Sequence, residues 1–87
     1  MSILFELYGV ARLRAGEDTV VVEGETNAAA LAALERACPA LSGTVIENGR
    51  LGRLYLLSLN GRSFVADPES RLAEGDRLIL MAAEGGG

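Results

Sequence analysis

Only one stretch of this chain has the periodicity of an amphipathic helix, and short alternating segments lie on both sides of it. Between Asn27 and Cys38 the apolar residues recur at intervals of three and four, which predicts a helix with one apolar stripe. Thr26 is a candidate N-cap residue, and Pro39 ends the helix because residues that precede proline avoid the α region. Such a helix can pack on one face of a sheet, so the remaining segments decide the fold.

The other segments with a clear pattern are strands. Ser2–Tyr8 alternates, so that Ile3, Phe5 and Leu7 share one face, which we assign to the core. Two weaker signals are a short helical piece around Val10–Arg14 and a short strand at Thr44–Ile46. The remaining predicted strands are Thr19–Glu23, Leu54–Leu59, Ser63–Ala66 and Arg77–Ala83.

The order of these elements is two strands, the main helix and then three strands. Asn60-Gly61 is typical of a tight type I′ turn, which predicts a hairpin of the strands on either side of it. This order indicates an α+β protein of the β-grasp, or ubiquitin-like, type: a mixed sheet of four to five strands with the main helix on one face. We expect one domain over residues 1–83 and a flexible glycine tail over residues 84–87.

The composition excludes several kinds of chemistry. Histidine is absent and cysteine occurs once, as Cys38, so His-dependent nucleophilic sites, zinc sites, iron–sulfur clusters and internal disulfides are not expected. Cys38 lies on the apolar stripe of the helix, which predicts a buried thiol. The net charge is −4, which disfavours direct binding of nucleic acid, and all eight basic residues are arginine.

We also expect a cytoplasmic protein that does not bind membranes. Ser2–Tyr8 is apolar but too short for the core of a signal peptide, and Glu6 interrupts it. No apolar run approaches the roughly 20 residues that span a bilayer.

Four short motifs follow one another along the chain. They are Tyr8-Gly-Val-Ala-Arg-Leu-Arg-Ala-Gly16, the Ala/Leu-rich helix from Thr26 to Pro39-Ala-Leu41, Leu59-Asn60-Gly61, and Glu74-Gly75-Asp76-Arg77 before an apolar strand and terminal glycines. In this order they resemble the sulfur-carrier branch of the ubiquitin-like proteins. That branch includes the small subunit of molybdopterin synthase, the thiamine- and cysteine-pathway carriers and the archaeal small modifiers.

The resemblance implies that the reactive group is the C-terminal carboxylate of Gly87, and that Gly85 and Gly86 thread the active site of a partner. An adenylating enzyme of the E1 type would activate that carboxylate with ATP, and a persulfide donor would convert it to a thiocarboxylate. A downstream enzyme would then accept the sulfur for the biosynthesis of a cofactor, an amino acid, a tRNA or a metabolite. The chain itself would bind no cofactor and would be a co-substrate of these enzymes.

The chain departs from the family pattern at its end. It carries three glycines where the family usually has two, so Gly86 becomes the working end if one residue is trimmed. Met81-Ala82-Ala83-Glu84 replaces a more proline-rich sequence, which leaves the identity of the partner open. Two other functions also remain open: a modifier conjugated to lysines of other proteins, and a β-grasp binding module without carrier chemistry. Because the chain has no lysine, it cannot be extended through lysines of its own.

The resemblance further implies docking through a face of the sheet. If the core assignment is right, Leu4, Tyr8, Ile79 and Met81 should face away from the main helix and form an apolar surface for a partner. Arg12 and Arg14 are either a second binding patch or ordinary solvated side chains.

Overall fold

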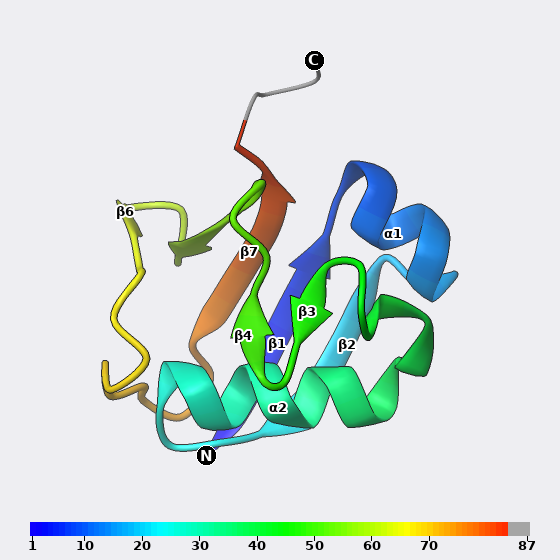
Figure 1. Cartoon of the computed structure of the whole chain (residues 1–87). Coiled ribbons are helices and arrows are strands. Elements are labelled where there is room, and N and C mark those ends of the chain that lie inside the picture. The colour runs from blue at the N-terminus through cyan, green and yellow to red at the C-terminus, as the bar shows by residue number, and fades with distance from the viewer. Residues whose placement is uncertain (84–87) are drawn as a thin grey trace.

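Five strands form one mixed sheet in the computed structural model, which describes residues 1–83 (Figure 1). They are β1 (Ser2–Leu7), β2 (Thr19–Glu23), β5 (Tyr55–Leu59), β6 (Ser63–Phe64) and β7 (Arg77–Ala82). The strand order is β2-β1-β7-β5-β6, in which β1 and β7 are parallel and the other neighbours are antiparallel. The predicted α+β, β-grasp architecture is confirmed.

The helices and a second, smaller sheet lie around this sheet. Helix α1 (Gly9–Ala15) follows β1, and α2 (Asn27–Ala37) crosses one face of the sheet (Figure 1). A 3-10 turn, η1 (Pro39–Leu41), follows α2. β3 (Ile46–Glu47) and β4 (Arg50–Leu51) form a two-stranded antiparallel hairpin on the same side as α2 (Figure 1).

The core lies between α2 and the sheet. Ile3, Phe5 and Leu7 of β1 are buried as predicted, and their neighbours on β7 are Leu78 and Leu80, which are fully buried as well. Together with Leu57 of β5 they pack in one cluster with the apolar stripe of α2. Alternate residues of each strand therefore point into the core, and the residues between them point to the opposite face.

Helix α2 begins and ends where the sequence indicates. The Thr26 hydroxyl accepts a hydrogen bond from the Ala29 N–H at 3.1 Å, and the 3-10 turn begins at Pro39. Gly24, between β2 and α2, is required for close packing, because a Cβ atom there would lie 2.7 Å from the Ala30 nitrogen. A glycine at this position lets the chain turn directly from β2 onto the helix.

Several elements differ from the predicted bounds, and the short strand β4 was not predicted. The short helical piece predicted around Val10–Arg14 is a complete helix, α1 (Gly9–Ala15). Ala11 packs in the core, and Gly16 ends the helix in the left-handed conformation (φ 72°). The short strand lies at Ile46–Glu47 rather than Thr44–Ile46, since the turn at Asn48-Gly49 (φ 53° and 76°) sets its pairing. β6 is shorter than predicted and ends at Phe64.

The side chain of Glu35 joins the β3–β4 hairpin to α2. One carboxylate oxygen accepts the Ser42 hydroxyl at 2.6 Å, and the other accepts the Gly49 N–H at 2.8 Å. These hydrogen bonds, that of Ser42 above all, lower the pKa of Glu35 below its usual value because they stabilise the carboxylate. The position of the hairpin thus depends on an ionised Glu35.

The side chain of Asn60 joins the hairpin of β5 and β6 to the start of β7. Asn60 and Gly61 both have positive φ (54° and 71°), and the Arg62 N–H donates to the Leu59 carbonyl at 3.0 Å, as in the predicted turn. The Asn60 amide donates to the Asp76 carboxylate at 3.1 Å, and its carbonyl accepts the Arg77 N–H at 2.9 Å. Asn60 therefore fixes the register of β7 as well as the turn.

We predict that Asn60→Gly, which keeps the backbone conformation but removes both side-chain hydrogen bonds, lowers the free energy of unfolding by about 1–2 kcal/mol. Asn60→Ala should cost more, because alanine is also strained at positive φ. Urea denaturation measures both values. Asn48→Gly is the matched control in the other hairpin, and it should stay within about 0.5 kcal/mol of the wild type. Equal stability of Asn60→Gly and the wild type would contradict this role of the side chain.

We also predict that Glu35 contributes to a loss of stability in acid. A carboxyl group whose pKa is lower in the folded than in the unfolded state stabilises the fold above the unfolded pKa and loses this effect as the pH falls. The melting temperature of Glu35→Gln should therefore fall less between about pH 7 and about pH 3 than that of the wild type. Glu47→Gln, in the same hairpin, is the control, because the Glu47 carboxylate accepts no hydrogen bond within residues 1–83. An unchanged pH profile for Glu35→Gln would refute the assignment.

Candidate functional site

The last described strand, β7, leads the chain to one end of the sheet. It lies between β1 and β5, and Ala82, its last residue, pairs with Tyr55. Beyond it the Ala83 N–H donates to the Leu54 carbonyl at 2.8 Å. The predicted reactive residues Gly85, Gly86 and Gly87 lie outside the described residues, as does Glu84. Because β1 and β7 are parallel, the chain reaches this end of the sheet beside the end of β1 and the start of α1.

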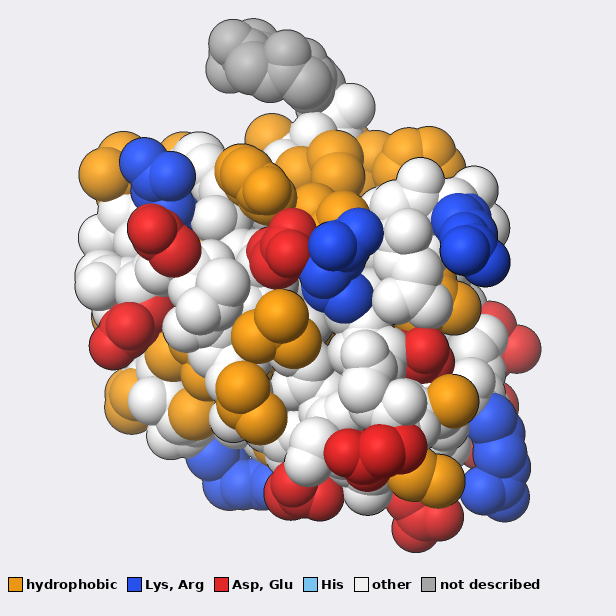
Figure 2. Space-filling view, turned by 180° about the vertical axis from the view of Figure 1, so that it is seen from behind, with side chains coloured by type: hydrophobic (Ala, Val, Ile, Leu, Met, Phe, Trp, Pro, Cys, Tyr) orange, Lys and Arg blue, Asp and Glu red, His pale blue; other side chains and the backbone are white. Residues whose placement is uncertain are grey.

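The face of the sheet opposite α2, which we call the open face, carries both apolar and polar side chains. Figure 2 shows hydrophobic side chains gathered on it, most densely at the end that β7 reaches. Leu4, Ile79 and Met81 lie on this face and are half-buried, because they alternate with the core residues of β1 and β7. Val21, which pairs with Leu4, is 66% exposed. The structure thus places Ile79 and Met81 in succession along one face of β7, whereas Leu4 lies opposite Arg77 at the start of that strand; their role in binding stays a prediction.

Tyr8, the fourth predicted contact residue, lies just after β1. Its hydroxyl donates to a carboxylate oxygen of Glu6 at 3.4 Å, which places its ring on the same side as the open face. Tyr8 is about half exposed, as are Val10 of α1 and, to a greater extent, Leu54 before β5. Exposed apolar side chains therefore surround the end of β7, where the chain leaves the sheet.

A charged pair lies within the open face, and sequence reasoning missed it. Glu6 of β1 and Arg77 of β7 approach to 3.5 Å between Oε2 and Nε, and the Glu6 side chain is only 22% exposed. Each residue alternates with core positions, so its outward direction could have been read from the sequence. Their contact could not, because it requires the parallel pairing of β1 with β7. The pair is a fixed polar feature between the apolar side chains of Leu4 and Ile79.

The two arginines of α1 do not form a separate basic patch. Arg12 approaches Asp18 at 3.5 Å, and both side chains are exposed. Arg14 is exposed in the last turn of the helix, where its positive charge interacts favourably with the negative end of the helix dipole. Their arrangement is that of solvated surface side chains.

Cys38 belongs to the core. It is 8% exposed at the end of α2, and burial raises the pKa of its thiol, with a further contribution from the negative charge of Glu17. Both effects disfavour the thiolate, which is the reactive form. In residues 1–83 no group of three or more acidic, histidine or cysteine side chains could hold a metal ion. The helices in this part of the chain are also too short to cross a bilayer.

Comparison with known proteins points to one group of structures. No protein-family model matches the sequence, and no curated protein matches it. Among solved structures, the chain is similar to the crystal structure of SAMP1 from Haloferax volcanii, with 32% identity over the whole of both chains and a TM-score of 0.85. A second crystal structure, of H. volcanii small archaeal modifier protein 1, shares 31% identity, covers 91% of this chain and 93% of that chain, and has a TM-score of 0.77.

A more distant similarity extends to a complex. The chain matches the crystal structure of the Amycolatopsis orientalis BexX/CysO complex with 20% identity and a TM-score of 0.79, covering 98% of this chain and 99% of the other. At this identity the match shows a shared fold.

We predict that Cys38 reacts slowly in the native protein. Labelling with a thiol reagent at mildly alkaline pH should be at least about tenfold slower in the native state than in urea, because the thiol is buried and its pKa is raised. The absorbance of the released chromophore gives both rates. Equal rates in the two states would mean that the thiol is accessible and would reopen the possibility of a cysteine-based function.

Proposed function

Because the chain belongs to the ubiquitin-like sulfur-carrier family that includes the small archaeal modifier proteins, we propose that it is a sulfur carrier whose C-terminal glycine is activated as an adenylate and converted to a thiocarboxylate. One structural observation carries the proposal. The central strand β7 leads directly into the sequence Glu84-Gly-Gly-Gly87 at the end of the sheet where exposed apolar side chains gather. A partner that binds this surface would have the glycines within its reach.

The glycines suit this chemistry for steric reasons. A carboxylate is a poor electrophile, so its activation requires transfer of AMP from ATP, with release of pyrophosphate. Attack by a persulfide on the acyl-adenylate releases AMP and forms an acyl disulfide, and a thiol of the partner then cleaves the S–S bond to leave the thiocarboxylate. Residues without a Cβ atom allow the chain to enter a narrow channel toward the ATP site. We propose Gly87 as the working end, or Gly86 if one residue is removed.

The chain's own side chains do not supply the catalytic groups. Histidine is absent, and the Cys38 thiol is buried. The adenylating enzyme, the persulfide donor and the sulfur acceptor are therefore separate partners, and ATP is bound by the first of them. The BexX/CysO complex, which contains a chain of the same fold, is consistent with a function carried out in complexes.

We assign docking of the adenylating enzyme to the open face. Leu4, Ile79 and Met81 supply apolar area next to β7, and Tyr8 extends it to the point where the chain leaves the sheet. The Glu6–Arg77 pair would orient the partner, because a charge embedded in an apolar interface must meet a complementary group.

A second candidate function is conjugation to other proteins. Its support is that two solved structures above 30% identity, both from H. volcanii, carry the names SAMP1 and small archaeal modifier protein 1. Both functions begin with the same adenylate, and they differ in whether a persulfide or a lysine amine attacks it. Because this chain has no lysine, a conjugate could not be extended through lysines of the chain itself.

We predict that incubation with ATP, a sulfur source and an extract of the source organism increases the intact mass by the difference between sulfur and oxygen. Fragmentation of the product should locate the change at Gly87 or Gly86. Deletion of Gly86 and Gly87 should abolish the change and leave the melting temperature unaltered, since we expect no core contact from these residues. Ile79→Asp, on the open face, should reduce the rate of activation while the protein stays folded.

The alternative outcomes are distinct. Covalent attachment to larger proteins without a gain of sulfur would favour the modifier function. No change at all, in an extract that modifies a known carrier, would overturn both functions. A fall in melting temperature on deletion as large as that of a core substitution would contradict the placement of the glycines outside the core.

A further inference from the structure

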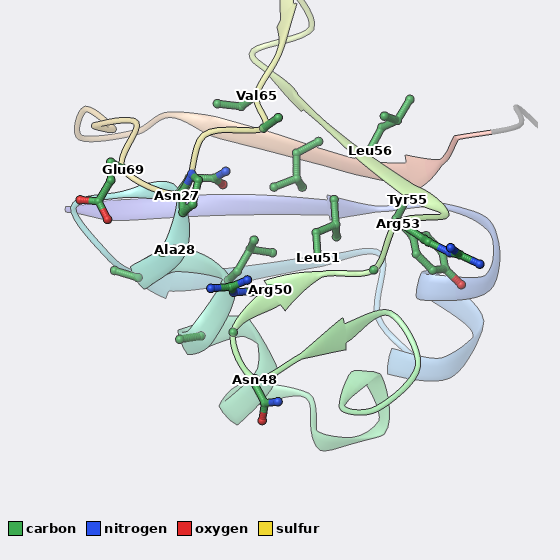
Figure 3. A pocket seen from close by; sticks show the side chains of 18 of the residues that line it. Asn27, Ala28, Asn48, Arg50, Leu51, Arg53, Tyr55, Leu56, Val65 and Glu69 are labelled. Carbon is green, nitrogen blue, oxygen red and sulfur yellow. The ribbon is translucent and has the colours of Figure 1, made fainter.

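A groove lies on the helix side of the sheet, between α2, the β3–β4 hairpin and the strands β5 and β6. Its volume is about 880 Å³. Figure 3 shows Ala28, Leu51 and Val65 bordering this space from three different elements, with Asn27 beside them. Leu31 of α2 and Leu57 of β5 are buried beneath it. The groove is thus mainly apolar, with the polar side chain of Asn27 at its border.

Two strand edges flank the groove. β4 pairs only with β3, and β6 is the last strand of the five-stranded sheet. Strand edges of this kind expose backbone N–H and C=O groups that can pair with an extended peptide. An extended ligand whose backbone N–H and C=O groups are free to pair with these edges fits such a channel better than a compact molecule.

A buried polar atom in the groove has no partner. Asn27, at the start of α2, is 3% exposed, and its amide nitrogen donates to the Asp67 carbonyl at 3.4 Å. Its side-chain oxygen accepts no hydrogen bond from the described residues. Because a buried acceptor without a donor is unfavourable, this oxygen calls for an N–H group from a ligand.

The charges at the groove favour an acidic ligand. Arg50 and Arg53 line it, both are exposed, and neither forms an ion pair within residues 1–83. Figure 3 shows Arg50 close to α2 and Arg53 beside Tyr55, whereas Glu69 lies at the other end. The lining thus carries one more positive than negative charge, in a chain whose net charge is −4, and another carboxylate, that of Glu47, is nearby because Glu47 pairs with Arg50 in the hairpin.

We propose that this groove binds an extended peptide segment of a partner protein in which apolar and acidic residues alternate. Successive side chains of an extended peptide point to opposite sides, so its apolar residues would enter the channel while its carboxylates face outward toward Arg50 and Arg53. A backbone N–H of the peptide would satisfy the Asn27 oxygen once that side chain turns toward the groove, since the oxygen is buried in the free chain. The proposal does not rest on carrier chemistry, because Leu4, Ile79 and Met81 of the open face do not line the groove, and the two surfaces meet only at Leu56, which pairs with Met81. A partner could therefore be held here while the open face and the glycines are engaged elsewhere.

The test uses the full chain and two fluorescein-labelled peptides, one alternating valine and glutamate and one with glutamine in place of glutamate. Fluorescence anisotropy should show binding of the acidic peptide, with affinity at least about tenfold weaker for the glutamine peptide. The double variant Arg50→Glu/Arg53→Glu should weaken binding of the acidic peptide by about tenfold or more. Ala28→Trp, which fills the groove without a change of charge, should abolish it.

The matched control is Arg14→Glu/Arg62→Glu, which reverses two exposed arginines outside the groove and should change the affinity by less than about twofold. Melting temperatures establish that each variant is folded. Amide chemical shifts of the wild type should change at Ala28, Leu51 and Val65 on addition of the acidic peptide. Absence of binding, equal weakening by the control variant, or shifts confined to Leu4, Ile79 and Met81 would each overturn the proposal.

Discussion

The insertion of β7 between β1 and β5 is the interaction on which the rest of the structure depends. Leu78 and Leu80 of this strand are fully buried, and they face the core residues of both neighbouring strands. Without β7, the antiparallel pair of β1 and β2 would have no hydrogen-bonded connection to the β5–β6 hairpin in the described sheet. The same strand carries Ile79 and Met81 on the opposite face, so the element that completes the core also forms the centre of the open face.

A single helix limits how much of such a sheet can be covered. Helix α2 has 11 residues and leaves one face of the sheet without a covering layer. On the helix side, the β3–β4 hairpin extends the cover toward β5 and is held there by Glu35. The cover is incomplete, and the groove lies where the helix, the hairpin and the edge of the sheet fail to meet. Both candidate binding surfaces thus follow from the small size of the chain.

The sequence was informative wherever structure depends on near neighbours. Alternation in Ser2–Tyr8, the cap at Thr26 and the turn at Asn60-Gly61 each determine a local conformation, and each was predicted. The lengths of α1 and β3 were not, because burial of Ala11 and the pairing of Ile46 with Leu51 involve tertiary contacts.

In the candidate surfaces, too, features set by near neighbours were predictable and features set by tertiary contacts were not. That Leu4, Ile79 and Met81 share a face follows from strand periodicity. The Glu6–Arg77 pair and the groove bring together residues that are distant in the chain, so no local pattern indicates them. The glycines that define the proposed function were found by their sequence alone.

The parallel pairing of β1 with β7 also has a consequence for the kinetics of folding. Leu4 lies opposite Arg77, so the two central strands of the sheet meet only after nearly the whole chain between them has closed into a loop. Contacts of such long sequence separation slow the search for the native state, because the entropy of loop closure is lost before the contacts form. The β5–β6 hairpin can form early from local contacts, and the pair of β1 and β2 needs only α1 between them, whereas the completed sheet must await the last strand.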